Sequence, residues 1–414
     1  MLNKLKNYKG NIQEVIITSL GQFLYLFQSL IQNKIFASYF ETTVFGQWAL
    51  LSSAYVFISM LPFTALEQGI NKEATEVRKN GYDRQFYSVI ALLYASCFSI
   101  YVVVLFFLNY LKKEDFFAHG YLSLFIIYTF TEIVKNTYLV LDNAYRNRKR
   151  VLYIRLVDLI NRIVPYIVLF HLNLFSIKTV LIVLCLTNIF ILFLQRNYLR
   201  EIRFQIDKTI GKQLLMRIIN FSSPLIIWAV FGWMQNMIGR WYLGMFLNLE
   251  AVAAYTILTS LSYFVPNMVY TVCNAYIMPI VFASRNRLTK SYLVKYLSIL
   301  AAGFSIYFVA ILFLGRWLII LLADPKYLII LEYLPITTLS SIFYVLAMSS
   351  TLEIYRRGET KKLLLSSLLP GAFMATVGFL LIKELQFQGV VLNYVLGHLI
   401  YVVLTSIVVV KNIE

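Results

Sequence analysis

Five charged side chains lie within long apolar stretches of this sequence, where a charge is costly unless it is paired or used. Glu132 and Lys135 are three residues apart, and Asp158 and Arg162 are four apart. On a helix, either spacing places the two opposite charges on one face. Arg240 has no acidic residue within one helical turn. The two pairs are therefore read either as self-neutralised packing pairs or, together with Arg240, as a substrate-binding lining for an anion.

Other polar chemistry is scarce in the sequence. It contains no GxxxxGK[ST], HExxH or GxSxG motif, and its three histidines are far apart. The cysteines each lie in an apolar run, without a CxxC spacing: Cys97, Cys185 and Cys273. We therefore expect no catalytic residue, no metal site and no cofactor, and we do not expect an enzyme. Coupling to an ion or to the membrane potential is compatible with this expectation.

The composition is that of a membrane protein. Sixty per cent of the 414 residues are hydrophobic and 14% are charged, whereas about a quarter of the residues in an average soluble protein are charged. A spanning helix needs about 20 mostly apolar residues. Such stretches predict an all-α integral membrane protein with about twelve transmembrane helices, at 12–34, 44–67, 86–111, 119–141, 151–171, 178–195, 218–243, 252–282, 294–314, 330–354, 363–382 and 389–410.

The basic residues predict the orientation of these helices. With the N-terminus inside, 27 of the 37 Lys and Arg residues fall in inside segments and 7 in outside loops. Cytoplasmic loops carry such an excess, so both termini are expected in the cytoplasm. The net charge of +17 is then a topology signal that can also attract anionic lipids. We expect no nucleic-acid partner.

The chain divides naturally near its middle. The longest inside loop, from Arg196 to Arg217, lies where a linker between two six-helix halves is expected. The segment 46–53 also faintly resembles 253–260, and each opens the second helix of its half. We therefore predict two six-helix bundles, 1–205 and 206–414. Transporters often place the substrate site between such repeats.

Several short motifs, in their order along the chain, resemble the polysaccharide flippases of the Wzx type in the multidrug/oligosaccharidyl-lipid/polysaccharide (MOP) exporter superfamily. They are Phe45-Gly46-Gln47-Trp48, Ala65-Leu66-Glu67-Gln68-Gly69-Ile70, Gly239-Arg240-Trp241-Tyr242-Leu243-Gly244, Ala253-Ala254-Tyr255, Gly315-Arg316-Trp317 with Lys326-Tyr327, and Phe387-Gln388-Gly389. The family pattern commonly has an acidic residue where Gly239 stands here. This departure leaves Arg240 freer to meet a substrate phosphate.

The resemblance implies a MATE/MOP-like fold and a function. Such proteins move undecaprenyl-diphosphate-linked oligosaccharides, including O-antigen units, between the leaflets of the bacterial plasma (inner) membrane by alternating access. The implied partners are this lipid-linked glycan, membrane lipids and, as candidates, glycan-assembly proteins. The implied substrate-binding residues are Arg240, Lys135 and Arg162, with Glu132 and Asp158 beside them.

Two rival functions remain. A MATE-type drug or cation antiporter has the same fold but usually carries core carboxylates for organic cations. The stretches Ile16 to Ile31 and Phe221 to Tyr242 contain no acidic residue, which favours an anionic cargo. A membrane O-antigen polymerase or glycosyltransferase usually places its catalytic residues on a large outer loop. The largest predicted outer loop, Gly315 to Ile329, is short for that role.

Overall fold

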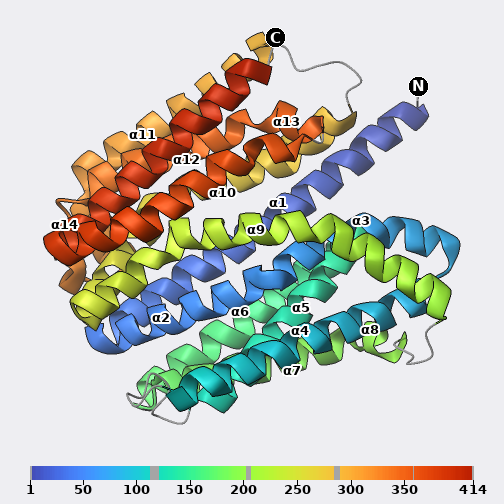
Figure 1. The fold of residues 1–414 in the computed structure, drawn as a ribbon, viewed down its shortest axis with the longest axis horizontal. Coiled ribbons are helices and arrows are strands. Elements are labelled where there is room, and N and C mark those ends of the chain that lie inside the picture. Colours follow the sequence, from blue (N-terminus) through green and yellow to red (C-terminus); the bar gives the residue numbers. More distant parts are fainter. Residues whose placement is uncertain (1, 112–120, 202–206, 284–289, 358, 413–414) are drawn as a thin grey trace. The chain divides into compact units, whose positions relative to one another are not determined.

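The computed structural model describes residues 2–111, 121–201, 207–283, 290–357 and 359–412. All regular secondary structure in these ranges is helical (Figure 1). This agrees with the predicted fold class. In hydrocarbon every backbone N–H and C=O needs an internal partner, and a helix supplies these partners within one segment.

Nine helical stretches of the described chain are long and apolar enough to cross a membrane. They are Thr42–Asn80, Asp83–Val103, Leu122–Ala144, Ile177–Leu194, Thr209–Phe246, Leu249–Cys273, Ser291–Leu322, Leu334–Ile354 and Lys361–Asn412. The last stretch contains two of the predicted spans. The remaining predicted spans correspond to α1 (Leu2–Tyr39) and to α6 (Arg148–His171), which carries Asp158 and Arg162 at mid-length.

The contacts between helices divide the chain into two compact units, residues 54–230 and residues 1–53 with 231–414. Helices α2 (Thr42–Ile58) and α9 (Lys208–Phe246) each run from one unit into the other. This division differs from the predicted halves, because α1 packs against α10 and α11. The predicted boundary at 205/206 touches residues 202–206, outside the described ranges, so the two six-helix halves stay a prediction.

The unit of residues 54–230 is organised around α5, which packs against α3, α6 and α7. Its other helices lie around this group, and α8 packs against α4 and α7. The elements of this unit are η1 (Ser59–Thr64), α3 (Ala65–Asn80), α4 (Asp83–Leu111), α5 (Leu122–Ala144), α6 (Arg148–His171), α7 (Ile177–Leu194) and α8 (Arg196–Glu201).

The unit of residues 1–53 and 231–414 is organised around α12, which packs against α10, α11 and α14. Its elements beside α1 and parts of α2 and α9 are α10 (Leu249–Ala283), α11 (Lys290–Leu322), η2 (Pro325–Ile330), α12 (Leu334–Ser350), α13 (Leu352–Arg356), η3 (Thr360–Leu363) and α14 (Leu364–Asn412).

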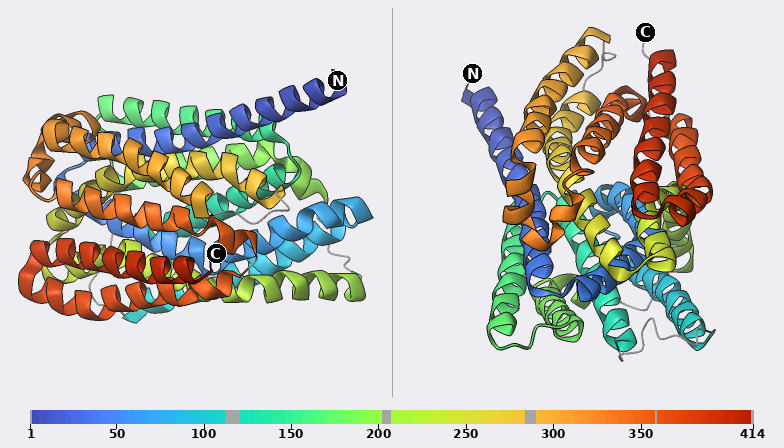
Figure 2. Two further views of the ribbon diagram at one scale, coloured as in Figure 1. Left: turned by 90° about the horizontal axis from the view of Figure 1, so that it is seen from above. Right: turned by 90° about the vertical axis from the view of Figure 1, so that its left-hand side faces the viewer.

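Helix α14 folds back on itself at Gln386, where φ is 53° and ψ is −124°. Figure 2 shows its two arms, in orange-red and red, side by side. The amide of Asn393 in the second arm donates to the Met374 carbonyl of the first at 3.3 Å. The two predicted spans 363–382 and 389–410 are therefore the two arms of one bent element.

Two lysines tie the end of α1 to the segment after α11. Lys34 Nζ donates to the carbonyls of Ile320 at 2.9 Å and Ala323 at 2.6 Å, near the C-terminus of α11. Lys326 Nζ donates in the opposite direction, to the Phe40 carbonyl at 2.7 Å. Burial lowers the pKa of Lys326 below its ordinary value. A helix C-terminus leaves carbonyls without helical partners, and a cation there is favourable.

The close approach of α2 to α10 depends on a glycine in the first resembling motif. A methyl group on Gly46 would collide with the backbone carbonyl of Leu249, the first residue of α10. We expect Gly46→Ala to lower the thermal unfolding midpoint in detergent, since overpacking typically costs about 1–3 kcal/mol. Gly303→Ala is the matched control, because its new methyl would meet open space. Equal unfolding midpoints for the two variants would show that α2 and α10 can move apart to accept the added methyl group without loss of stability.

Candidate functional site

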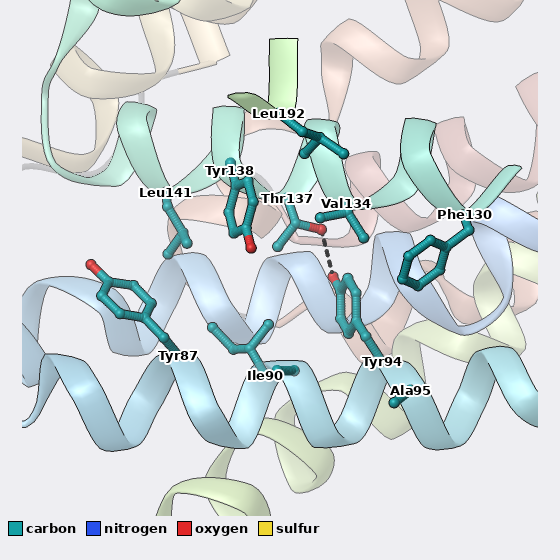
Figure 3. Close-up of a pocket in the computed structure, with 11 residues that line it drawn as sticks. Tyr87, Ile90, Tyr94, Ala95, Phe130, Val134, Thr137, Tyr138, Leu141 and Leu192 are labelled. Atoms are coloured by element: carbon teal, nitrogen blue, oxygen red, sulfur yellow. Dashed lines mark hydrogen bonds between the residues drawn. The ribbon is translucent and has the colours of Figure 1, made fainter. Parts of the chain in front are cut away.

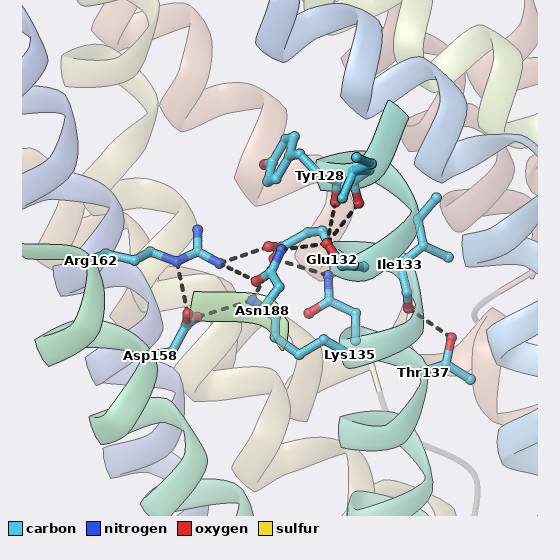
Figure 4. A network of polar contacts seen from close by, with 11 residues as sticks. Tyr128, Glu132, Ile133, Lys135, Thr137, Asp158, Arg162 and Asn188 are labelled. Atoms are coloured by element: carbon cyan, nitrogen blue, oxygen red, sulfur yellow. Dashed lines mark hydrogen bonds and ion pairs between the residues drawn. The ribbon is translucent and has the colours of Figure 1, made fainter. Parts of the chain in front are cut away.

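Four of the five predicted site residues come together in one buried network of ion pairs (Figure 4). Lys135 Nζ lies 2.8 Å from Glu132 Oε1 and 3.2 Å from Asp158 Oδ2. Arg162 Nη2 lies 2.7 Å from Glu132 Oε2, and its Nε lies 2.8 Å from Asp158 Oδ1. Each carboxylate therefore contacts both cations, and the four formal charges cancel.

The network is built from three neighbouring helices. Glu132 and Lys135 are on α5, Asp158 and Arg162 are on α6, and Asn188 on α7 accepts from Arg162 Nη2 at 3.3 Å. The Asn188 amide in turn donates to Thr131 Oγ1 at 3.2 Å. The sequence predicted the contacts within each helix from spacing alone. The contacts between helices depend on how α5 and α6 pack.

The burial of this network carries a cost in free energy. Lys135 is 0% exposed and Arg162 is 6% exposed. Taking paired charges out of water costs several kcal/mol per ion, and good geometry with added hydrogen bonds offsets this cost. In this arrangement Lys135 and Arg162 are both occupied by carboxylates. Their predicted role in substrate binding stays a prediction, and it requires the network to open.

Arg240, the fifth predicted residue, belongs to the other unit and has a different environment. It is half-buried on α9, and its Nε has no hydrogen-bond partner among the residues that the structure describes. Its electrostatic neighbours are the phenol groups of Tyr255 on α10 and Tyr394 on α14. Within the described residues, no carboxylate forms an ion pair with Arg240. A guanidinium held among hydroxyl groups can donate two parallel hydrogen bonds to a phosphate.

The position before Arg240 is also closely packed. A methyl group on Gly239 would lie 2.7 Å from a Val390 side-chain carbon and 3.3 Å from the Tyr255 ring. An acidic side chain, which the resembling family commonly has here, would have to displace these groups. The packing therefore explains why the arginine lacks an adjacent acidic partner.

The sequence did not single out two uncharged residues, Asn188 in the ion-pair network and Tyr394 beside Arg240. Asn188 lies in a predicted span, and its amide was a signal that a polar partner is near. Tyr394 is on the same helix as Asn393 and His398, two polar residues that stand out in an apolar span. Tyr394 reaches Ser341 Oγ at 2.8 Å, and its ring lies 4.1 Å from that of His398. Tyr394, an electrostatic neighbour of Arg240, is therefore also in contact with Ser341 and His398.

An apolar cavity of about 250 Å³ lies between α4, α5 and α7 in the unit of residues 54–230 (Figure 3). Most of its lining is hydrocarbon, and a hydrogen bond of 3.0 Å between Thr137 Oγ1 and Tyr94 OH crosses one wall. The lining residues are Tyr87, Ile90, Ala91, Tyr94, Ala95, Phe130, Val134, Thr137, Tyr138, Leu141 and Leu192.

Comparison with solved structures identifies the architecture. An inward-facing multidrug resistance MATE family transporter of the MOP superfamily superposes with a TM-score of 0.70 at 14% identity, over 94% of this chain and 93% of that one. The chain has the fold of the MATE transporters. A point mutant of the Vibrio cholerae MATE transporter VcmN matches with a TM-score of 0.65 at 13% identity, over 99% and 98% of the two chains.

The MATE fold is also shared by a protein of different pocket chemistry. A MOP superfamily transporter from Pyrococcus furiosus, described as having a binding pocket of reverse polarity that suggests a different function, matches with a TM-score of 0.61 at 12% identity, over 97% and 94% of the chains. No protein-family model and no curated protein sequence matches this chain. The predicted MATE/MOP-like, multi-pass membrane fold is confirmed, while the substrate has to be argued from the side chains.

Proposed function

We propose that this chain is a MOP-superfamily transporter that flips an undecaprenyl-diphosphate-linked oligosaccharide across the bacterial plasma membrane by alternating access. The fold is that of transporters. The observation that carries the choice of cargo is Arg240, a half-buried guanidinium among phenol groups without a carboxylate partner in the described chain. An unpaired cation at membrane depth is expensive, so a protein that keeps one uses it.

The carboxylates argue against an organic-cation cargo. Glu132 and Asp158, the acidic residues at the middle of α5 and α6, are each held by two cations. The stretch of α9 that contains Arg240, from Phe221 to Tyr242, has no acidic residue at all. A MATE-type drug antiporter fits the fold equally well, but a cationic drug would meet no free carboxylate in these places.

The polymerase or glycosyltransferase alternative has less support. Between α11 and α12 the chain forms only the short helix η2, and Lys326 in it is tied to the end of α1. This segment offers little room for a catalytic loop. We therefore propose a transporter rather than an enzyme. The plasma-membrane location, the cytoplasmic termini, and the lipid and glycan-assembly partners belong to the same proposal.

Complementation tests the proposal against its rival. The gene is expressed in a bacterial strain that lacks its own flippase, and surface glycan is measured with a lectin or antibody while ethidium efflux is measured in a strain lacking drug exporters. We expect restored display and no efflux. Ethidium efflux without glycan display would overturn the proposal in favour of the drug antiporter, and neither activity would also overturn it once immunoblotting shows the protein in the membrane.

A further inference from the structure

The apolar cavity between α4, α5 and α7 has an opening at its side. Helix α4 packs against α3 and α8, while α5 packs against α7. Across the gap, long side chains meet: the ring centroids of Phe98 on α4 and Phe130 on α5 are 4.9 Å apart. Two of the lining residues, Ala95 and Phe130, are exposed. The cavity is therefore a crevice with a mouth at these two residues, here named the α4 crevice.

The mouth lies on an exposed apolar face of α4. Ala95 shares this face with Leu92, three residues earlier, and with Val103, eight residues later. Leu92 is 47% exposed and Val103 is 67% exposed. All three belong to Asp83–Val103, one of the stretches able to cross a membrane. The medium around such a stretch in a bilayer is hydrocarbon, so lipid chains have access to the mouth.

The dimensions of the α4 crevice suit one hydrocarbon chain. It extends from Tyr87, one turn after the start of α4, to Ala95, roughly 12 Å further along the helix. Figure 3 shows Tyr87 and Leu141 at one end of the lining side chains and Ala95 and Phe130 at the other. The volume of about 250 Å³ is below the roughly 300–1,000 Å³ of sites for drug-sized ligands. A slender apolar chain lying along α4 matches this space.

Aromatic and basic side chains surround the end of the crevice at Tyr87. The ring centroid of Tyr198, on α8, lies 5.5 Å from that of Tyr87, and Arg150 lies over the Tyr198 ring at 5.3 Å. Tyr87 OH donates to Tyr145 OH at 3.1 Å. Arg78 lies over the Tyr145 ring at 4.6 Å. A cation is attracted to the face of an aromatic ring, so these rings hold two arginines beside this end of the crevice.

A third arginine lies at the end of α7. Arg196 lies over the ring of Phe193 at 4.7 Å, and Phe193 follows the lining residue Leu192. Arg78 and Arg196 are exposed, and Arg150 is half-buried. These three arginines are here named the basic rim. They lie at the helix ends that the positive-inside pattern predicts to be cytoplasmic, which is the level of the lipid headgroups.

The charge around the basic rim is strongly positive. The segments 78–84 and 142–150, together with Arg196, contain eight Lys or Arg residues and two acidic residues, Asp83 and Asp142. Asp142 is 0% exposed, so its carboxylate offers little repulsion to a ligand at the surface. Basic residues near the membrane surface attract anionic lipids. The α4 crevice thus combines an apolar slot with a rim complementary to a negatively charged headgroup.

We propose that the α4 crevice is a binding site for an anionic phospholipid, with one acyl chain in the slot and the phosphate at the basic rim. The lipid enters through the mouth at Ala95 and Phe130, and arginine suits its phosphate because the guanidinium can donate two parallel hydrogen bonds. The site is independent of the cargo. It goes beyond the proposed transport function and is tested without a transport assay.

A polyprenyl phosphate shares the chemistry of an apolar chain with an anionic head, but the crevice favours a phospholipid. An isoprenoid chain carries a methyl branch on every unit and needs a wider slot than an unbranched acyl chain. Phospholipids also form the bulk of the surrounding bilayer, and occupancy rises with ligand concentration. The polyprenyl phosphate is therefore the competitor in the experiment.

Photocrosslinking of the full-length protein in phosphatidylcholine vesicles tests the site. The probe is a small fraction of phosphatidylglycerol with a diazirine on its acyl chain, and labelled peptides are identified by mass spectrometry. We expect the label to concentrate on the lining residues of α4 and α7. Phosphatidylcholine with the same diazirine chain, at the same mole fraction, should label them roughly 25-fold less, since each of the two exposed arginines contributes about fivefold in affinity for an anionic headgroup.

Two pairs of variants separate the slot from the rim. Ala95→Phe fills the mouth and should remove the label, whereas Ala302→Phe on the exposed face of α11 should not. The double variant Arg78→Gln with Arg196→Gln should lower labelling by phosphatidylglycerol to the level of phosphatidylcholine. Lys295→Gln with Lys361→Gln removes two exposed charges, also on the predicted cytoplasmic side, and should change nothing. Unfolding midpoints confirm that each variant is folded.

Three results would overturn the proposal, and each can be seen in the wild type even if a variant fails to fold. Label spread evenly over all lipid-facing helices would mean that the crevice binds no lipid in particular. Equal labelling by phosphatidylglycerol and phosphatidylcholine would mean that the basic rim does not select the headgroup. Loss of the label on adding undecaprenyl phosphate, but not on adding unlabelled phosphatidylglycerol, would assign the crevice to a polyprenyl chain instead.

Discussion

Arg240→Ala is expected to abolish surface glycan display in the complemented strain while the protein remains in the membrane. Hydrogen bonds to charged groups contribute about 1.5–3 kcal/mol each, and a guanidinium can make two of them to one diphosphate. The variant would also remove the positive charge beside the Tyr255 and Tyr394 phenol groups. Arg240→Lys should retain part of the display, because it keeps the charge but loses the planar fork.

The matched control is Arg316→Ala, which removes an exposed arginine from α11 in the same unit. Membrane levels of each variant are checked by immunoblotting. We expect Arg316→Ala to display glycan like the wild type. Full display with Arg240→Ala would mean that this cation does not hold the cargo, although another residue could still do so.

The sequence was most informative about the number and position of the helices. The predicted span 252–282 lies within α10 (Leu249–Ala283), and the predicted spans 363–382 and 389–410 are the two arms of α14. Hydropathy shows where a segment is apolar and not where its helix begins. For this reason the span predicted at 12–34 is only part of α1, which begins at Leu2. The basic first residues continue the helix.

The candidate site was only partly predictable. Spacing on one helix is fixed by helical geometry, so the contacts Glu132–Lys135 and Asp158–Arg162 could be expected from sequence. The cross-contacts, Lys135–Asp158 and Arg162–Glu132, depend on the rotation of α5 against α6. No local pattern encodes that rotation. The same holds for Asn188, which matters because α7 brings it within reach of Arg162.

The structure therefore separates residues that the sequence grouped together. Lys135, Arg162 and Arg240 were proposed as one cationic lining, yet two of them are neutralised and one has no ion-pair partner in the described chain. The network between α5, α6 and α7 is neutral overall. We therefore expect the stability of the protein to depend on the charge balance of this network more than on any single residue in it, and this can be tested without knowing the cargo.

Arg162→Met is accordingly expected to destabilise the protein strongly, by about 3–5 kcal/mol, the usual cost of removing one partner from a buried ion pair. It leaves Lys135 as the cation whose contacts with both Glu132 and Asp158 the structure shows, with Arg155 as a further electrostatic neighbour of Asp158, and so removes positive charge from beside two buried carboxylates.

The double variant Arg162→Met with Asp158→Asn restores neutrality, because Glu132 and Lys135 remain as a pair 2.8 Å apart. We expect it to recover most of the loss, even though it departs further from the natural sequence. Unfolding midpoints in detergent, with the exposed Lys149→Ala on α6 as a control for charge removal alone, measure the three variants against the wild type. A double variant less stable than Arg162→Met would show that specific contacts, rather than charge balance, stabilise this part of the protein.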